Sequence, residues 1–366
     1  MLILQRHYLK EFLKLLFLIG TGLALLFSIL DLIEKIDDFM PNRPSLENLL
    51  LYAFFNFPKY LLYLVPAAVL ICSLFIFSQA SRNREFVVIK SAGGRLKSLF
   101  YPFIISGILV SIFAFIVGEI VVPDFSRRSN ELKNTLKKKD KKIIFKEGSL
   151  WLRAADGSPV RIELYIPEKR LAKGVSIFVF EKGFLKERIE AEEAKWEEVP
   201  GDPLRRKGSK GIWKLKNVIV YDIESGKIDR ISEKVFLYLE SPDFFSKEIK
   251  TPAEMGIGEL YRYTERLKKS GFRNTKLIVD LHSKISYPLI NLFMILLGIS
   301  LSMNSKIGGG LFAAGLGLLI STVYWFTYTL MLSMGYAGVV SPIIAAWIVP
   351  IIFGIAAIYL FRKIPE

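Results

Sequence analysis

The sequence predicts an α-helical membrane protein with six transmembrane helices and an inserted antiparallel β domain. Three long apolar segments precede residue 124, and three more follow residue 276. A helix needs about 20 largely apolar residues to cross the hydrocarbon core of a bilayer. The expected spans are Leu15–Leu32, Tyr60–Phe77, Phe100–Val122, Ile285–Met303, Leu311–Met334 and Val339–Phe361. The stretch from Ile144 to Tyr238 contains no such run, so it is expected to fold outside the bilayer.

Composition narrows the chemistry that the chain can perform. Hydrophobic residues make up 52% of the 366 positions and charged residues 23%, which suits a protein divided between bilayer and water. Cys72 is the only cysteine, which excludes an intrachain disulfide and a redox pair. The two histidines, His7 and His282, are far apart in sequence and predict no metal cluster. We therefore expect no metal, no other cofactor and no catalytic residue.

Basic residues gather in the segments that six crossings would place on one side of the membrane. They are Arg6, Lys10, Lys14, Arg82, Arg84, Lys90, Arg95, Lys97, Arg362 and Lys363. The opposite loops carry mixed charges (residues 34–47) or none (residues 335–341). Because lysine and arginine favour the cytoplasmic side of short loops, both termini are expected in the cytoplasm and the middle domain in the periplasm. The net charge of +15 partly reflects this bias, and no basic helix or aromatic platform indicates nucleic-acid binding.

The middle domain is predicted to consist of antiparallel strands. Val160, Ile162, Leu164 and Ile166 alternate with more polar residues, which is the period of a half-buried strand. An Asp-Gly pair just before this run predicts a tight turn. Further strands are predicted at Ser149–Arg153, Val175–Phe180, Phe184–Trp196, Gly211–Tyr221 and Val235–Leu239. Short strands at this spacing are typical of a sandwich or a jelly roll.

One of these strands, Val175–Phe180, is apolar on both faces apart from its serine. It is either a central strand covered on both sides, or a strand with one face lining a groove for an apolar ligand. In the second case Ile177 and Val179 are candidate substrate contacts, with Phe178 and Phe180 on the other face.

Two helices are predicted beside the middle domain. The first, Phe125–Lys142, is polar and rich in lysine, and the second, Glu254–Lys269, is amphipathic. The lysines, which include Lys133 and Lys137, form either a solvated helix face or an anion site. Near a bilayer surface they would favour phosphate-bearing lipid.

The loop Ser81–Leu96, between the second and third spans, is predicted to form a short helix with one apolar side. That side consists of Phe86, Val87 and Ile89. Glu85 is the one acid among five basic residues in and directly after the loop, which are Arg82, Arg84, Lys90, Arg95 and Lys97. A short amphipathic helix of this kind can dock into a groove of a cytoplasmic motor by a few apolar anchors and a charge. The alternative is an ordinary interfacial helix in which Glu85 pairs with Arg82 or Lys90.

Several motifs follow one another along the chain. They are R-E-F-V-V-I-K-S-A-G-G at 84–94, G-E-x-x-x-P at 118–123, L-W at 150–151 with D-G at 156–157, S-K-I-x-x-P-L at 283–289 and S-P-I-I at 341–344. Together they resemble the lipopolysaccharide export permease family, the LptF/LptG pair. The L-W and S-K-I-x-x-P-L motifs favour the LptG member. The resemblance covers essentially the whole chain.

The resemblance implies one half of a transporter. Such permeases pair with a homologous six-span permease (here an LptF-like chain) and sit on a dimer of a cytoplasmic ATPase. They extract lipopolysaccharide from the outer leaflet of the inner membrane and pass it to a bitopic periplasmic bridge protein built of similar jelly rolls. The implied organisation is residues 1–123 with a coupling helix at 82–94, a periplasmic domain at 124–275, and residues 276–366.

The resemblance also implies functional residues. The ATPase-coupling set would be Arg84, Glu85, Phe86, Val87 and Ile89. Basic residues that bind lipid phosphates in the family are implied at the outer end of the first span and after the third span. Here the first site has only Lys35 among four acids, and the second keeps Lys133 but has Asn130 where a basic residue is expected. Lys137 and the lysines after it would compensate.

Two other classes of protein are alternatives to the transporter. One is a membrane-anchored periplasmic binding or scaffolding module, for which six spans are excessive. The other is a lipid-modifying enzyme, but no histidine or nucleophile accompanies the acids at the outer end of the first span. The chain has no G-x-x-x-x-G-K-[ST] motif, so ATP hydrolysis is expected in a separate chain. A glycine- and alanine-rich stretch at 308–317 is either internal packing or a subunit seam.

Overall fold

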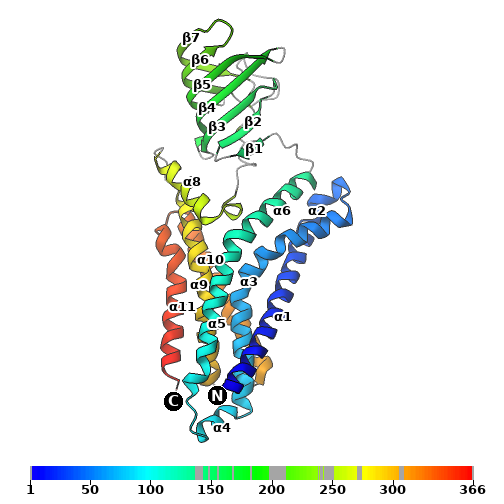
Figure 1. The fold of residues 1–366 in the computed structure, drawn as a ribbon, viewed down its shortest axis with the longest axis vertical. Coiled ribbons are helices and arrows are strands. Elements are labelled where there is room, and N and C mark those ends of the chain that lie inside the picture. Colours follow the sequence, from blue (N-terminus) through cyan, green and yellow to red (C-terminus); the bar gives the residue numbers. More distant parts are fainter. Residues whose placement is uncertain are drawn as a thin grey trace. The chain divides into compact units, whose positions relative to one another are not determined.

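The computed structural model describes residues 2–136, 143–146, 149–154, 156–166, 169–181, 184–197, 212–237, 239, 242, 251–269, 274–304 and 309–364. The chain forms two compact units (Figure 1). The helical unit comprises Met1–Lys138 and Pro252–Glu366, and the sheet unit comprises Lys139–Thr251.

The helical unit contains six helical segments that are long and apolar enough to span a membrane, counted over the described residues. They are built on α1 (Leu2–Glu34), α3 (Leu46–Arg82), α5 (Leu96–Ile116), α9 (Thr275–Asn304), α10 (Gly309–Tyr336) and α11 (Pro342–Arg362). The third continues through a π-helical turn, η2 (Val117–Val121), into α6 (Val122–Leu136). The prediction of six apolar helices is confirmed. The sixth begins three residues later than expected, because Pro342 suits the first position of a helix.

Short elements lie at the two ends of this helical unit. Both chain termini and α4 (Glu85–Ser91) are at one end (Figure 1). At the other end are α2 (Ile36–Phe39), η1 (Met40–Asn42), the end of α6, η4 (Pro252–Glu254) and α8 (Ile257–Lys269). The Asn42 side-chain amide donates to the Leu136 carbonyl at 2.8 Å, and that of Asn130 donates to the Glu254 carboxylate at 2.5 Å. The chain therefore leaves the helical unit and returns to it at the end opposite to α4.

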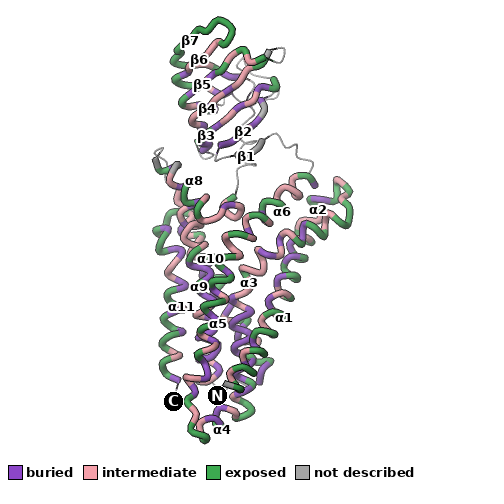
Figure 2. The backbone as a smooth tube through the Cα atoms, in the orientation of Figure 1, coloured by how far each residue is buried: buried purple, intermediate pink, exposed green. Residues whose placement is uncertain are grey.

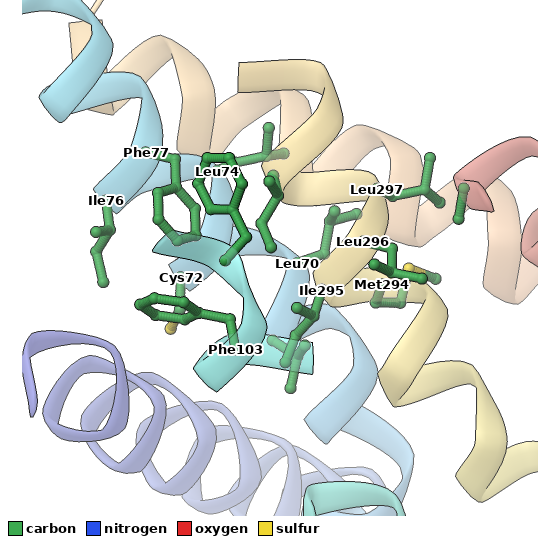
Figure 3. Close-up of a cluster of buried hydrophobic side chains, with 14 of the residues drawn as sticks. Leu70, Cys72, Leu74, Ile76, Phe77, Phe103, Met294, Ile295, Leu296 and Leu297 are labelled. Carbon is green, nitrogen blue, oxygen red and sulfur yellow. The ribbon is translucent and has the colours of Figure 1, made fainter. Parts of the chain in front are cut away.

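The centre of the helical unit is formed by α3 and α9, the most buried of the six spans (Figure 2). Figure 3 shows Leu70, Leu74 and Phe77 of α3 gathered with Phe103 of α5 and Ile295 of α9 in one apolar cluster. Cys72 is buried in the same cluster, as expected for an inert thiol.

Close approach of α3 and α9 depends on a glycine. A Cβ atom at Gly298 would lie 1.8 Å from the Ser73 hydroxyl oxygen of α3. Small residues of α10 serve the same purpose, since a Cβ at Gly317 would lie 3.1 Å from the Ile71 Cα. Gly315 has open space around its missing Cβ. Gly317 of the predicted small-residue stretch therefore packs internally, whereas Gly315 does not.

The sheet unit is a seven-stranded antiparallel sheet over the residues that the structure describes. Its strands are β1 (Ile143–Lys146), β2 (Ser149–Arg153), β3 (Pro159–Ile166), β4 (Leu171–Glu181), β5 (Phe184–Glu197), β6 (Ile212–Asp222) and β7 (Ile228–Phe236). Each strand pairs with the next one in sequence, so the described strands form a meander without crossovers. A jelly roll contains Greek-key connections, and that prediction is not confirmed.

The predicted strands mostly coincide with observed ones. The alternation in β3 is confirmed as far as Leu164, since Val160, Ile162 and Leu164 are buried and Glu163 is exposed. It ends at Tyr165, which is buried like Ile166 after it. β7 begins seven residues earlier than predicted. Its first six residues are all exposed, so they lack the apolar alternation that marks a half-buried strand.

Candidate coupling and substrate sites

The helix α4 is delimited by backbone geometry at both ends. Arg84 has a left-handed backbone (φ 59°), which turns the chain away from α3. At the other end Gly93 has φ 77°, the conformation that glycine adopts most easily. The Gly94 amide donates to the Ile89 carbonyl at 2.8 Å and the Gly93 amide to the Lys90 carbonyl at 2.9 Å, which is a Schellman motif. The result is a short, well-defined helix at the tip of the unit.

The apolar residues of α4 divide between two directions. Phe86 and Ile89 are buried in the core of the helical unit, and the ring of Phe86 meets that of Phe100 edge-on at 6.1 Å. Val87 and Val88 are 63% and 65% exposed. Of the three predicted apolar anchors, Phe86 and Ile89 hold α4 onto the spans, and Val87 remains at the surface together with Val88.

Glu85 is linked to the first span. The hydroxyl of Tyr8, a buried residue of α1, donates a hydrogen bond to one carboxylate oxygen of Glu85. The side-chain amide of Asn83 donates to the other at 3.1 Å. These two neutral donors take the place of Arg82 and Lys90, the partners considered from the sequence. The carboxylate is therefore half-buried and held in position at the start of α4.

At the opposite end, Lys35 belongs to a closed polar cluster. Its ammonium group pairs with the Asp31 carboxylate at 2.5 Å and donates to the Tyr52 hydroxyl at 3.0 Å. Asp31 also accepts hydrogen bonds from Tyr52 at 3.0 Å and from Tyr60 at 2.6 Å. The Lys59 ammonium lies over the Tyr60 ring, 5.4 Å from its centroid.

The charge of Lys35 is largely neutralised inside this cluster. Burial lowers the pKa of Lys35, but hydrogen bonds to Asp31 and Tyr52 raise it by more, so the net pKa lies above its ordinary value. The lysine stays charged at neutral pH, and its side chain is only 26% exposed. Because Lys35 already pairs with Asp31, little of its positive charge remains to attract a phosphate group.

The other candidate lysines lie after the third span. Lys133 is half-buried on α6. Lys137 lies outside the described residues.

Between the third span and α6, the Glu119 carboxylate accepts a hydrogen bond from the Ile257 backbone amide at 2.6 Å. Glu119 thus holds the first turn of α8, and a Cβ at Gly256 would lie 2.7 Å from one of its oxygens.

In the sheet unit, the two faces of β4 differ. Ile177 is buried in the apolar core of the unit and Val179 packs partly against that core. On the other face Phe178 stacks on Trp151 at 6.2 Å between ring centroids, and Phe180 is 50% exposed. The strand is therefore covered on one side and partly open on the other. Ile177 reaches a substrate only if the core around it opens.

The order of these features along the chain can be compared with known families. The family model for the lipopolysaccharide export system permease LptF/LptG matches residues 6–363. The chain belongs to this family. The match covers α1 through α11 and the whole sheet unit between them, and it does not separate LptG from LptF. No curated protein matches the chain.

Membership makes this chain a permease subunit of the lipopolysaccharide export system and not an enzyme. Its six apolar helices fit a protein of the inner membrane. The structure also shows hydrogen-bond partners of Glu85 and Asp31 that the sequence motifs do not indicate. Tyr8 beside Glu85, and Tyr52 and Tyr60 around Asp31, come from other helices. A tyrosine in an apolar run gives no indication of which distant acid its hydroxyl meets.

Proposed function

We propose that this permease is one of two homologous six-span subunits of an ABC-type exporter, driven by a dimer of a separate cytoplasmic ATPase. The LptG-like motifs at 150–151 and 283–289 lead us to assign it to the LptG side of the pair, with an LptF-like partner. The observation that carries the proposal is the family match over nearly the whole chain, combined with α4 presented at one tip of the helical unit.

The tip that carries α4 is assigned to the cytoplasm. Both termini share this tip, and the basic residues of the short loops gather there, as the positive-inside rule requires of a cytoplasmic side. The sheet unit is inserted between α6, which ends at Leu136, and η4, which begins at Pro252; both lie at the opposite end, so we assign the sheet unit to the periplasm. Single cysteines at Asn83 and Ser341, in a Cys72→Ala background, should label from opposite sides. Labelling of both from outside would overturn this orientation.

Coupling is assigned to the exposed surface of α4. Val87 and Val88 are free to enter an apolar groove of the ATPase, and Glu85 supplies an acid beside them. Phe86 and Ile89 pack in the core of the helical unit, so a movement of α4 would also move α3 and α5. Arg84 sets the turn that aims the helix.

The substrate path is assigned to the outer half of the spans and the sheet unit. Lipopolysaccharide would leave the outer leaflet near α1, where Lys35 lies, and pass Lys133 on α6. Its acyl chains would then follow the apolar core face of the sheet, near Ile177 and Val179, to a bitopic periplasmic bridge protein. The half-covered β4 and the apolar core of the sheet unit support this assignment.

Copurification tests the proposal. The full chain, solubilised in mild detergent, should bring down a second six-span chain and an ATPase subunit. Val88→Asp should release the ATPase, because it places a charge in an apolar contact. The matched control is Val339→Asp, an equally exposed valine at the opposite end of the unit, which should leave the ATPase bound. A chain that purifies alone would instead be an anchored scaffolding module.

A further inference from the structure

A groove of about 670 Å³ lies between α1 and α5, in the half of the helical unit next to α4. Its walls are mainly apolar: Leu9 and Leu13 come from α1, and Ile105, Leu109 and Phe113 come from α5. The groove has the size of sites that hold small ligands. At its polar end the Gln5 side-chain amide donates to the Ser98 carbonyl at 2.7 Å, which joins the two helices.

Basic residues stand beside this polar end. Arg6 directly follows Gln5 and Lys10 directly follows Leu9, and both side chains are exposed. Arg95, also exposed, lies three positions before Ser98. Glu11 is an exposed acid on the same part of α1, so the basic residues outnumber it. The combination is an apolar groove with a positively charged mouth.

We propose that this groove binds an acyl chain of an anionic phospholipid, with the lipid phosphate held by Arg6, Lys10 and Arg95. Basic pockets between transmembrane helices, at the end where positive residues gather, are suited to anionic lipid headgroups. The lipid comes from the leaflet next to α4. It is therefore distinct from the exported substrate, which enters from the other leaflet.

The walls favour a lipid chain over a partner helix. Helix pairs in membranes pack through small residues that let the backbones approach. Here the rim carries large side chains, and Ile105 and Leu109 are both more than half exposed. A flexible acyl chain can follow such an uneven surface, and the nearby arginines can reach its headgroup at the interface.

Native mass spectrometry of the full chain in mild detergent tests this site. Phosphatidylglycerol and phosphatidylcholine with identical acyl chains are the probes. We expect one phosphatidylglycerol to be retained roughly tenfold better than phosphatidylcholine, because basic residues near a bilayer surface attract a headgroup with a net negative charge. Inorganic phosphate at millimolar concentration should not displace the lipid, because it lacks the acyl chain.

Two pairs of variants separate the groove from general lipid contact. Leu109→Trp fills the groove and should reduce phosphatidylglycerol retention severalfold, while Ile108→Trp on the same helix should not, because residue 108 does not line it. Arg6→Gln with Lys10→Gln should remove the preference for the anionic lipid. The control is Arg127→Gln with Arg128→Gln on α6, which makes the same charge change at the other end.

Folding of each variant is checked by its thermal midpoint, and Leu109→Phe replaces the tryptophan variant if that one does not fold. Equal retention of both lipids by the unaltered chain would overturn the proposal, as would unchanged retention in both groove-filling variants. Displacement by inorganic phosphate would reduce the site to an anion site. Cross-linking of a cysteine at Ile105 to the partner permease in the copurified complex would show a helix seam instead.

Discussion

The Tyr8 hydroxyl of α1 donates a hydrogen bond to the Glu85 carboxylate at the start of α4. The first span and the proposed ATPase-docking helix are therefore joined directly, although 77 positions separate them. A charge-assisted hydrogen bond is stronger than one between neutral groups. Movement of α4 on the ATPase would thus reach α1 as well as α3 and α5.

Tyr8→Phe tests this link. The substitution keeps the buried ring and removes one donor to Glu85, a loss of about 1.5–3 kcal/mol for a hydrogen bond to a charged group. We expect a lower rate of lipopolysaccharide export with the ATPase still copurifying. Tyr359→Phe, at a largely exposed tyrosine of α11, is the control and should export normally. Unchanged export in Tyr8→Phe would remove α1 from the coupling pathway.

The Asp31–Lys35 pair predicts a double-mutant cycle. Lys35→Met leaves the Asp31 carboxylate without its cation and should destabilise the helical unit by about 1–3 kcal/mol, less than for a fully buried pair because Lys35 is partly exposed. Asp31→Asn with Lys35→Met should recover much of that loss. The thermal midpoint of the full chain is the measurement. Additive effects of the two substitutions would mean that the pair contributes nothing.

Gly298 predicts a packing effect. Gly298→Ala places a methyl group against Ser73 on α3, and overpacking of this kind costs about 1–3 kcal/mol. Gly315→Ala is the matched control, because nothing lies within 4 Å of its missing Cβ and alanine favours a helix. The thermal midpoint should fall in the first variant and hold or rise in the second. Equal thermal midpoints in Gly298→Ala and Gly315→Ala would show that α3 and α9 do not approach as closely as the structure indicates.

The sheet unit makes a prediction about lipid passage. Photo-crosslinking residues at Ile177 and Val179, on the core face of β4, should capture lipopolysaccharide when ATP is supplied and fail to do so when hydrolysis is blocked. Phe178 and Phe180, on the opposite face, are the control positions. Capture at all four positions without ATP would indicate nonspecific contact, and the sheet unit would then be a structural bridge.

Local patterns in the sequence were sufficient to predict most of the elements, but not β1 or the first part of β7. Each apolar run became a helix because a continuous stretch of this length has few alternatives in a bilayer. The alternation at Val160–Ile166 became β3 because one face of that strand is buried. The exposed start of β7 escaped prediction because it lacks a buried face to impose a pattern.

The candidate sites could be predicted only in part, because their geometry depends on contacts between distant helices. From the sequence, Phe86 and Ile89 were predicted to be apolar anchors at the surface. In the structure the packing of α4 against the spans buries both side chains. The sequence also showed Lys35 surrounded by acids without revealing that Asp31 and two tyrosines close around it. Periodicity within one segment carries no information about a partner tens of residues away.

The most direct test of the account is ATP-dependent lipopolysaccharide release from vesicles that contain the full complex of both permeases and the ATPase. Glu85→Lys reverses the charge at the start of α4, and Glu259→Lys on α8 is the control for an added positive charge at the other end. The account predicts release that requires ATP in the unaltered complex and in Glu259→Lys, and is lost in Glu85→Lys while the ATPase stays bound. Normal ATP-dependent release by Glu85→Lys would contradict coupling through α4.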